Sequence, residues 1–196
     1  MRPTMVARKQ YTVGEILEIT RLATLTALAA RRRGIRCDRQ FSERIMLAVT
    51  EVNGCELCSY AHSRFALDAG MDEVEVRRLL GGVTDGVPDR ELAGVAFGQH
   101  YADTRGRPGA EAWEEVVRHY GEESLCVLVA VRTMMWGNAL GIPMSALRAR
   151  LRDRPYPGST LGYEIGTSIA GTLVTPVGVL LGWLDAVRGR SVLAVD

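Results

Sequence analysis

The residues with the clearest chemical potential in this sequence are Cys55, Cys58 and His62. Asn53 and Gly54 form a helix-breaking pair, so both cysteines are expected in the first turn of a new helix, where free amides and the positive dipole end favour thiolates. The cysteines are three residues apart and His62 follows Cys58 by four, which places all three side chains on one helix face. A thiol pair beside a base indicates redox or metal chemistry.

The cysteine pair allows three interpretations. Cys55, Cys58, His62 and Glu43 could together supply four zinc ligands, but structural zinc sites generally use two C-x-x-C pairs or more histidines, which the sequence does not offer. A pair of buried structural cysteines would leave both the break at Gly54 and the presence of His62 unexplained. We therefore favour a redox dithiol with no metal.

Glu43 is the candidate partner of His62. It precedes the Asn53-Gly54 turn by ten residues, and His62 follows that turn by eight. In an antiparallel helical hairpin, both residues would lie about 12 to 15 Å from the turn, at about 1.5 Å per residue. The two side chains are therefore expected to meet across the hairpin.

The remaining sequence predicts helices only. Apolar residues recur at helical spacing, and no segment shows the alternation that is typical of strands. The length suits one helical domain with a sizeable core. We predict an all-α, multi-helix fold in one domain over residues 1–196, with the motif core at 38–82 and an apolar C-terminal helix at 160–188. The expected helices cover residues 13–33, 38–52, 55–69, 72–80, 89–103, 110–120, 124–140 and 144–151.

Two segments resemble each other within the chain. Leu67–Arg77 and Asn138–Arg148 both contain a helical stretch, a glycine, an apolar residue, a helix-capping position and a second helical stretch. A duplicated architecture and two ordinary helix–turn–helix joints both account for this similarity.

The first 40 residues are basic, with nine Lys or Arg against three acidic residues, while the net charge of the chain is only +1. A nucleic-acid surface is one interpretation of the run Arg31-Arg32-Arg33. A solvated helix end is favoured instead, because cations complement the C-terminal dipole and no aromatic residues alternate with the arginines. No nucleic-acid partner is expected.

The other two cysteines, Cys37 and Cys126, are interpreted as unpaired, with Cys126 in the core, because their spacing is not that of a secreted disulfide framework. The segment Met1–Gln10 has no apolar stretch after its basic residues, so no signal peptide is predicted. Both observations favour a cytoplasmic location.

The segment from Ile165 to Leu184 contains 20 residues without a charge, enough to cross the roughly 30 Å core of a bilayer. Its Gly178-x-x-x-Gly182 spacing permits close helix contact in membranes. Pro176 and several Gly and Thr residues weaken lipid insertion. Burial in a soluble homo-oligomer is therefore favoured, and a membrane anchor is the alternative.

The pattern Glu43-x(11)-Cys55-Glu-Leu-Cys58-x(3)-His62 resembles the alkylhydroperoxidase-D-like branch of the carboxymuconolactone decarboxylase family. The similarity covers residues 42–82, including Arg64–Met71. It implies an all-helical fold, assembly into trimers or hexamers, and a dithiol that reduces hydroperoxides or disulfides with electrons from an external thiol. The decarboxylases of this family lack the cysteine pair, which argues against that activity.

The resemblance assigns roles to four residues. Cys58 corresponds to the cysteine that reacts with peroxide and Cys55 to the resolving cysteine, while His62 and Glu43 correspond to a proton relay. Better-known members have a second histidine between the cysteines, where this chain has Leu57.

No flavin, haem or nucleotide motif is present in the sequence, so no cofactor is expected. Trp136 and Asn138 are candidates to line the site of a neighbouring half or subunit. The competing hypothesis is a non-catalytic protein: a redox sensor or a membrane-attached interaction protein that uses the same dithiol.

Overall fold

The computed structural model describes residues 9–192, and within that range it contains α-helices, one 3-10 helix and no strand. This confirms the all-α prediction. The elements are α1 (Val13–Arg32), α2 (Arg39–Asn53), α3 (Glu56–Asp68), α4 (Glu73–Leu80), α5 (Asp89–Asp103), α6 (Ala110–Tyr120), η1 (Gly121–Glu123), α7 (Ser124–Arg150) and α8 (Leu161–Val187).

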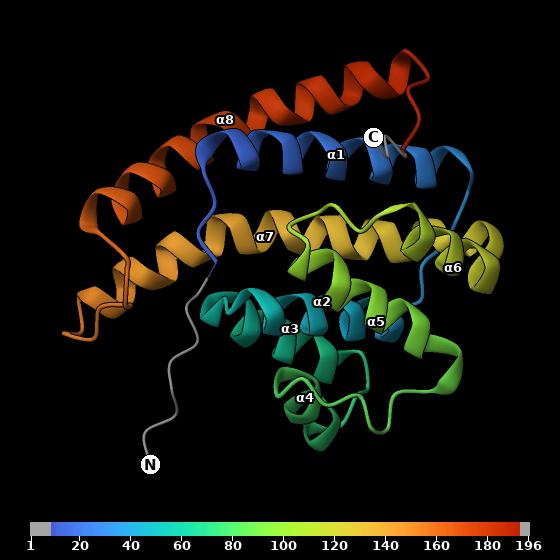
Figure 1. The fold of residues 1–196 in the computed structure, drawn as a ribbon, viewed down its shortest axis with the longest axis horizontal. Coiled ribbons are helices and arrows are strands. Elements are labelled where there is room, and N and C mark those ends of the chain that lie inside the picture. The colour runs from blue at the N-terminus through green and yellow to red at the C-terminus, as the bar shows by residue number, and fades with distance from the viewer. Residues whose placement is uncertain (1–8, 193–196) are drawn as a thin grey trace.

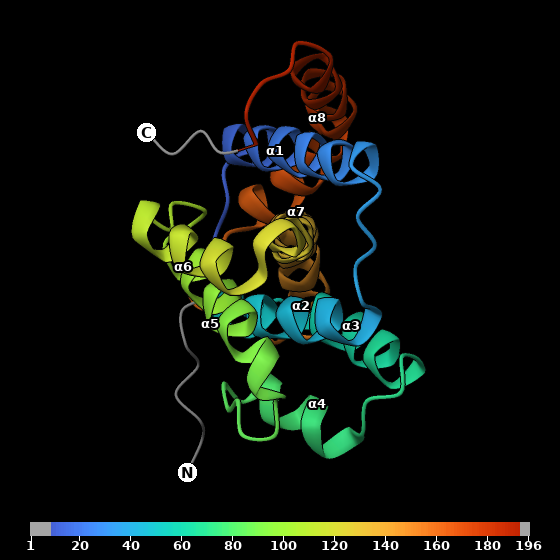
Figure 2. The ribbon, with the colours of Figure 1, turned by 90° about the vertical axis from the view of Figure 1, so that its right-hand side faces the viewer.

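Helix α7 lies in the middle of the molecule. Figure 1 shows α8 and α1 on one side of it and α2, α3 and α5 on the other, with α4 farthest out, and the perpendicular view in Figure 2 shows the same order. Helix α7 contacts α1, α2, α3, α5, α6 and α8. A helix that is covered on all sides must be apolar around its whole circumference, and α7 contributes much of the hydrophobic core.

Several helix boundaries follow from capping residues, as the sequence predicted. Asp38 accepts a hydrogen bond from the Phe41 N–H at 2.8 Å, and Asp72 accepts one from the Glu75 N–H at 2.8 Å. These carboxylates satisfy amides that have no partner inside their helices. Gly54 ends α2 in the left-handed region, with φ of 72°, where a side chain would be strained.

The prediction of two helices over 124–140 and 144–151 is wrong, because α7 is continuous through Pro143. Proline removes one backbone hydrogen bond from a helix. Gly141, Ile142 and Pro143 are all buried, so packing from both sides holds the helix across the missing bond. The internal similarity therefore does not correspond to repeated structure: Gly70, with φ of 92°, follows the end of a helix, whereas Gly141 lies inside one.

Arg44 joins three helices beneath the hairpin of α2 and α3. Its Nε lies 2.5 Å from the Glu75 carboxylate of α4, and its Nη1 lies 2.8 Å from the Glu91 carboxylate of α5. The Arg44 and Glu91 side chains are almost fully buried, so each charge requires the other for compensation. This network fixes α2, on which Glu43 lies.

Helix α8 packs against α1 through its glycines. A Cβ added at Gly178 would lie 2.7 Å from the Cβ of Thr20, and one at Gly182 would lie 2.7 Å from the Cβ of Thr24. The Gly-x-x-x-Gly spacing therefore provides close contact within the chain, between α8 and α1.

The two carboxylates of α8 are buried and paired. Glu164 receives hydrogen bonds from Arg150 at 2.6 and 2.9 Å, and these lower the pKa of its carboxyl. Asp185 pairs with Arg21 of α1 at 2.5 Å. Ion pairs thus hold both ends of α8 against the rest of the chain, and its opposite face carries no charge.

The outer face of α8 is apolar and exposed in the single chain. By length and composition, α8 and the segment Ala110–Arg150 both pass as candidate membrane spans, but the apolar window of the second is 72% buried and that of α8 only 22%. The large exposed apolar residues of α8 are Leu161, Ile165, Ile169, Leu173, Val177, Val179, Leu180, Trp183 and Val187. Burial of α8 in an oligomer therefore stays a prediction.

The α1–α8 contact can be tested with two glycine substitutions in one helix. Gly178→Ala should lower the melting temperature by several degrees, because the new Cβ would lie within 3.0 Å of Thr20 and of the Leu17 carbonyl oxygen. Overpacking of this kind typically costs about 1 to 3 kcal/mol. Thermal unfolding followed by circular dichroism measures the change.

Gly166→Ala is the matched control, because nothing lies within 4 Å of its added Cβ. This variant should be as stable as the wild type or more stable, since alanine has the higher helix propensity. Equal melting temperatures for the two variants would contradict the close α1–α8 contact.

Candidate functional site

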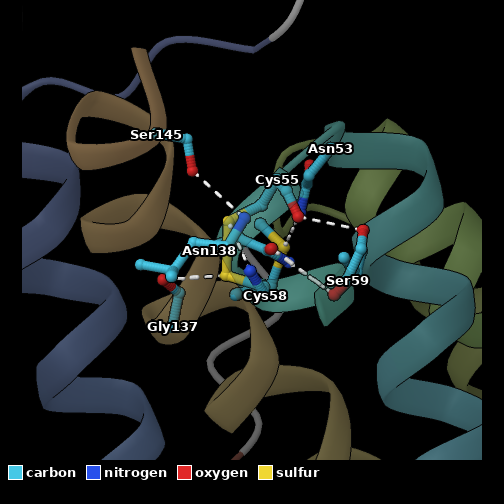
Figure 3. The surroundings of a disulfide bond; sticks show 10 residues. Asn53, Cys55, Cys58, Ser59, Gly137, Asn138 and Ser145 are labelled. Carbon is cyan, nitrogen blue, oxygen red and sulfur yellow. Dashed lines mark hydrogen bonds between the residues drawn. A yellow bond between two sulfur atoms is a disulfide. The ribbon is translucent and has the colours of Figure 1, made fainter. Parts of the chain in front are cut away.

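Cys55 and Cys58 lie at the start of α3 and form a disulfide (Figure 3). Cys55 is the N-cap residue, and its Sγ accepts a hydrogen bond from the Cys58 N–H at 3.3 Å. Both sulfurs are therefore at the positive end of the helix dipole, which stabilises a thiolate after reduction. The predicted placement of the pair in the first helical turn is confirmed. Cys55 is fully buried, and Cys58 is 7% exposed.

Helix α7 closes the other side of the pair. Gly141 leaves the space that the sulfurs fill, because a Cβ at this position would lie 2.6 Å from Cys55 Sγ and 2.7 Å from Cys58 Sγ. The Gly137 carbonyl oxygen lies 3.5 Å from Cys58 Sγ, where a reduced thiol can donate to it. The Ser145 hydroxyl accepts a hydrogen bond from the Leu57 N–H at 3.2 Å. Figure 3 shows α7 running past the cysteines on this side.

The turn before Cys55 is braced from the N-terminal side. The Tyr11 hydroxyl donates to Asn53 Oδ1 at 2.8 Å, and Asn53 Nδ2 lies 3.3 Å from the Met135 sulfur. Burial raises the pKa of Tyr11, so its hydroxyl stays protonated and continues to donate. Asn53 is fully buried, and this brace fixes the end of α2 next to the reactive cysteines.

His62 and Glu43 meet across the α2–α3 hairpin, as the sequence predicted. His62 Nδ1 lies 2.8 Å from Glu43 Oε2, and the two side chains are largely buried. The edge of the Phe65 ring packs on the imidazole, with centroids 5.4 Å apart. A carboxylate that accepts from Nδ1–H leaves Nε2 as the unprotonated nitrogen of a neutral imidazole. His62 follows Cys58 by one helical turn, which puts the two residues on the same side of α3.

The structure thus gathers Cys55, Cys58, His62 and Glu43 at one hairpin. The sequence did not reveal the part played by Gly137, Gly141 and Ser145. All three lie on α7, which the sequence analysis had predicted as two separate helices. Asn138 was a candidate to line a site in a neighbouring half or subunit, and it lies beside the disulfide of its own chain (Figure 3), where its side chain faces Thr50 at 3.4 Å.

The interpretation of Cys37 and Cys126 as unpaired is wrong, because they form a second disulfide. This disulfide joins the α1–α2 connection to the first turn of α7. The sequence separation of 89 hides the pairing of the two cysteines in the sequence, and the fold brings their Cα atoms to 5.2 Å. No cysteine in the part of the chain that the structure describes is free.

Within residues 9–192, no group of three or more His, Cys, Asp or Glu side chains is arranged to hold a metal ion. The chain matches no model of a known protein family, no curated protein and no solved structure.

The disulfide pattern gives a direct test. After full reduction and mild oxidation, all four thiols should disappear through two intramolecular disulfides. Cys55→Ser should keep one free thiol at Cys58 and retain the Cys37–Cys126 bond. Thiol titration combined with peptide mass mapping measures both.

Cys37→Ser is the control for the motif, and it should retain a disulfide between Cys55 and Cys58. A Cys58 that pairs with Cys37 or Cys126 in the wild type would contradict the arrangement. The same holds if Cys55→Ser loses the Cys58 thiol without an adduct to a second molecule.

Proposed function

We propose that this protein is a thiol-dependent, alkylhydroperoxidase-like oxidoreductase that reduces hydroperoxides or disulfides with the Cys55–Cys58 dithiol. The observation that carries the proposal is the 2.8 Å contact between His62 Nδ1 and Glu43 Oε2, one helical turn from a cysteine pair at a helix start. This arrangement provides a base, His62, that is held in position by Glu43. It also provides two thiols that are close enough to form a disulfide. The resemblance of residues 42–82 to the alkylhydroperoxidase-D-like branch supports the same activity.

Cys58 is the attacking cysteine, because it is the more exposed of the two residues and corresponds to the peroxide-reactive cysteine in the resemblance. His62 Nε2 accepts the thiol proton directly or through one water, while Glu43 stabilises the resulting imidazolium. The thiolate then attacks the terminal oxygen of a hydroperoxide, and the O–O bond breaks. Cys58 becomes a sulfenic acid, and the other oxygen leaves as an alcohol after it takes the proton back from His62.

Cys55 completes the oxidative half of the cycle. Its thiol sulfur attacks the sulfur of the Cys58 sulfenic acid, which forms the disulfide and releases one water. Two thiol groups from an external donor then reduce the disulfide by exchange, and the donor leaves as its own disulfide. One hydroperoxide is thereby converted to one alcohol and one water for each pair of donor thiols.

Leu57 stands between the cysteines, where the better-known relatives have a histidine. It is 37% exposed, and its side chain contributes no proton-transfer group. Glu43 and His62 therefore carry the proton transfer without a third group. No other group should compensate for their loss, so turnover should fall.

A redox sensor is the second candidate. The burial of both sulfurs favours it, because limited access slows reaction with bulky substrates. Turnover separates the two functions. A catalyst consumes many equivalents of peroxide per subunit when a dithiol donor is present, whereas a sensor is oxidised once and then changes its partner or assembly state.

Substitutions of the relay test the mechanism. Glu43→Gln and His62→Ala should each reduce turnover by about 100-fold or more, since positioned general bases contribute this much. Each should also raise the pH at which reduced Cys58 reacts with an alkylating reagent. Groups that act as one unit are not additive, so the double variant should be little worse than the worse single variant.

His100→Ala is the matched control, because His100 lies on α5, which does not contact α3, and its Nε2 lies 2.8 Å from the Pro108 carbonyl oxygen. It should leave turnover and the alkylation profile unchanged. An unaltered alkylation profile in Glu43→Gln, or single effects that multiply in the double variant, would disprove the relay.

We also propose that the protein is a homo-oligomer and that the apolar outer face of α8 is its interface. About nine large apolar residues on this face are half exposed, which would leave an extensive apolar surface in water. Ile169→Glu together with Leu173→Glu should convert the oligomer to smaller species in light scattering, while Val117→Glu, a similarly exposed residue on α6, should not.

The alternative for α8 is a lipid environment. We expect a carbonate wash of cell membranes to leave the protein in the supernatant, because Pro176 and the many Gly and Thr residues disfavour insertion. Retention in the pellet would identify α8 as an anchor and overturn the oligomer proposal for this face.

A further inference from the structure

A groove of about 900 Å³ lies beside the first turn of α3. Three segments form its walls: the start of α3, the last turns of α7 and the connection from α7 to α8. Its volume is within the range of about 300 to 1,000 Å³ that is common for small-molecule sites. The lining residues are Glu56, Leu57, Tyr60, Met144, Ser145, Arg148, Ala149, Arg152, Asp153, Arg154, Pro155 and Tyr156.

The groove adjoins the dithiol. Leu57 lies between the two cysteines in the chain, and its N–H donates to the Ser145 hydroxyl at 3.2 Å across the floor of the groove. Gly141, which contacts both sulfurs, precedes Ser145 by one turn of α7. A molecule in the groove is therefore next to the helical turn that carries the reactive sulfur.

Three guanidinium groups line the groove without a partner among the residues that the structure describes. Within residues 9–192, the side chains of Arg148, Arg152 and Arg154 have no hydrogen bond or ion pair, and all three are exposed. Arg150, between them in sequence, differs because Glu164 neutralises it at 2.6 Å. Glu164 is thus already paired and does not neutralise the other three arginines.

The spacing of these arginines is unfavourable in the absence of an anion. Arg148 lies in the last turn of α7 and Arg152 lies two residues beyond the end of that helix, so two cations four residues apart in the lining of one groove repel each other. Glu56 and Asp153 are the acidic residues of the lining, so cations exceed anions there by three to two. A planar guanidinium binds a carboxylate through two parallel hydrogen bonds, and an anion between the arginines would relieve their repulsion.

Part of the lining is apolar, and Leu57, Met144, Ala149 and Pro155 belong to it. Leu57, Tyr60 and Met144 present large exposed side chains, and Met144 can adapt to different apolar shapes. A ligand that fits this lining combines an apolar body with an acidic head group.

We propose that this groove binds the carboxylate of an amphipathic organic hydroperoxide, with Arg148 and Arg152 as the carboxylate-binding residues. The inference rests on the proposed peroxidase function and adds the class of substrate, a carboxylic acid with a hydroperoxide on its apolar chain. The redox balance is unchanged: the hydroperoxide becomes an alcohol, the dithiol becomes a disulfide with loss of one water, and the external thiol donor restores it.

The kinetic test compares linoleic acid hydroperoxide with its methyl ester, both below their aggregation concentrations and with dithiothreitol as the neutral donor. The wild type should show a higher kcat/KM for the acid. In the double variant Arg148→Gln/Arg152→Gln, the acid-to-ester ratio of kcat/KM should fall by about fivefold, since exposed charge-assisted bonds are modest in strength. Arg118→Gln, an exposed arginine on α6, is the matched control and should leave the ratio unchanged.

A binding test without turnover separates the groove from the activity. Calorimetric titration with decanoate should show binding to the wild type and to Arg118→Gln, and weaker binding to the double variant. This difference should shrink at high salt, because exposed charges are screened. Circular dichroism checks that each variant is folded.

The outcomes distinguish the two proposals. If the wild type turns over both hydroperoxides and the double variant has the same acid-to-ester ratio of kcat/KM, the groove proposal is overturned. The peroxidase proposal then stays intact. Absence of turnover with both hydroperoxides would overturn the peroxidase proposal, and decanoate binding would then decide the groove alone. Equal decanoate binding by the wild type and the double variant would overturn the groove as a carboxylate site.

Discussion

The close approach of α7 to the first turn of α3 is the constraint on which the candidate site depends. At Gly141, the helix backbone comes so near to Cys55 and Cys58 that no side chain fits between them. This contact buries the cysteine pair. The Ser145 hydroxyl accepts a hydrogen bond from the Leu57 N–H, and the Gly137 carbonyl oxygen can accept one from a reduced Cys58 thiol. A helix start normally leaves its amides to water, and here α7 supplies part of the missing partners.

The carboxylate–imidazole pair depends on the same hairpin. Glu43 reaches His62 only because α2 and α3 are held antiparallel, and this requires Gly54 in its left-handed conformation. Arg44, next to Glu43, ties α2 to α4 through a partly buried ion pair and to α5 through a buried one. The polar groups of the hairpin therefore position His62, and the apolar core formed by α7 positions the sulfurs.

Helix α8 has two faces with different functions in the fold. Its small residues allow α1 to approach closely, and its two buried carboxylates are neutralised by Arg21 and Arg150. The opposite face contains no charge and is open to solvent in the single chain.

The pairing of Cys37 with Cys126 bears on the location of the protein. The cytoplasmic expectation rested partly on these residues being unpaired, and it loses that support.

The sequence by itself determined most local structure, since caps such as Asp38 and Asp72 and the break at Gly54 act through neighbouring atoms. It also predicted that His62 and Glu43 meet, because both lie at similar distances from one turn. Only the tertiary structure decided the continuity of α7 through Pro143 and the pairing of Cys37 with Cys126. Packing around a buried helix outweighs the loss of one hydrogen bond, and contacts between distant segments leave no periodic signal in the chain. For the same reason, the closeness of Gly141 to the sulfurs could be found only in three dimensions.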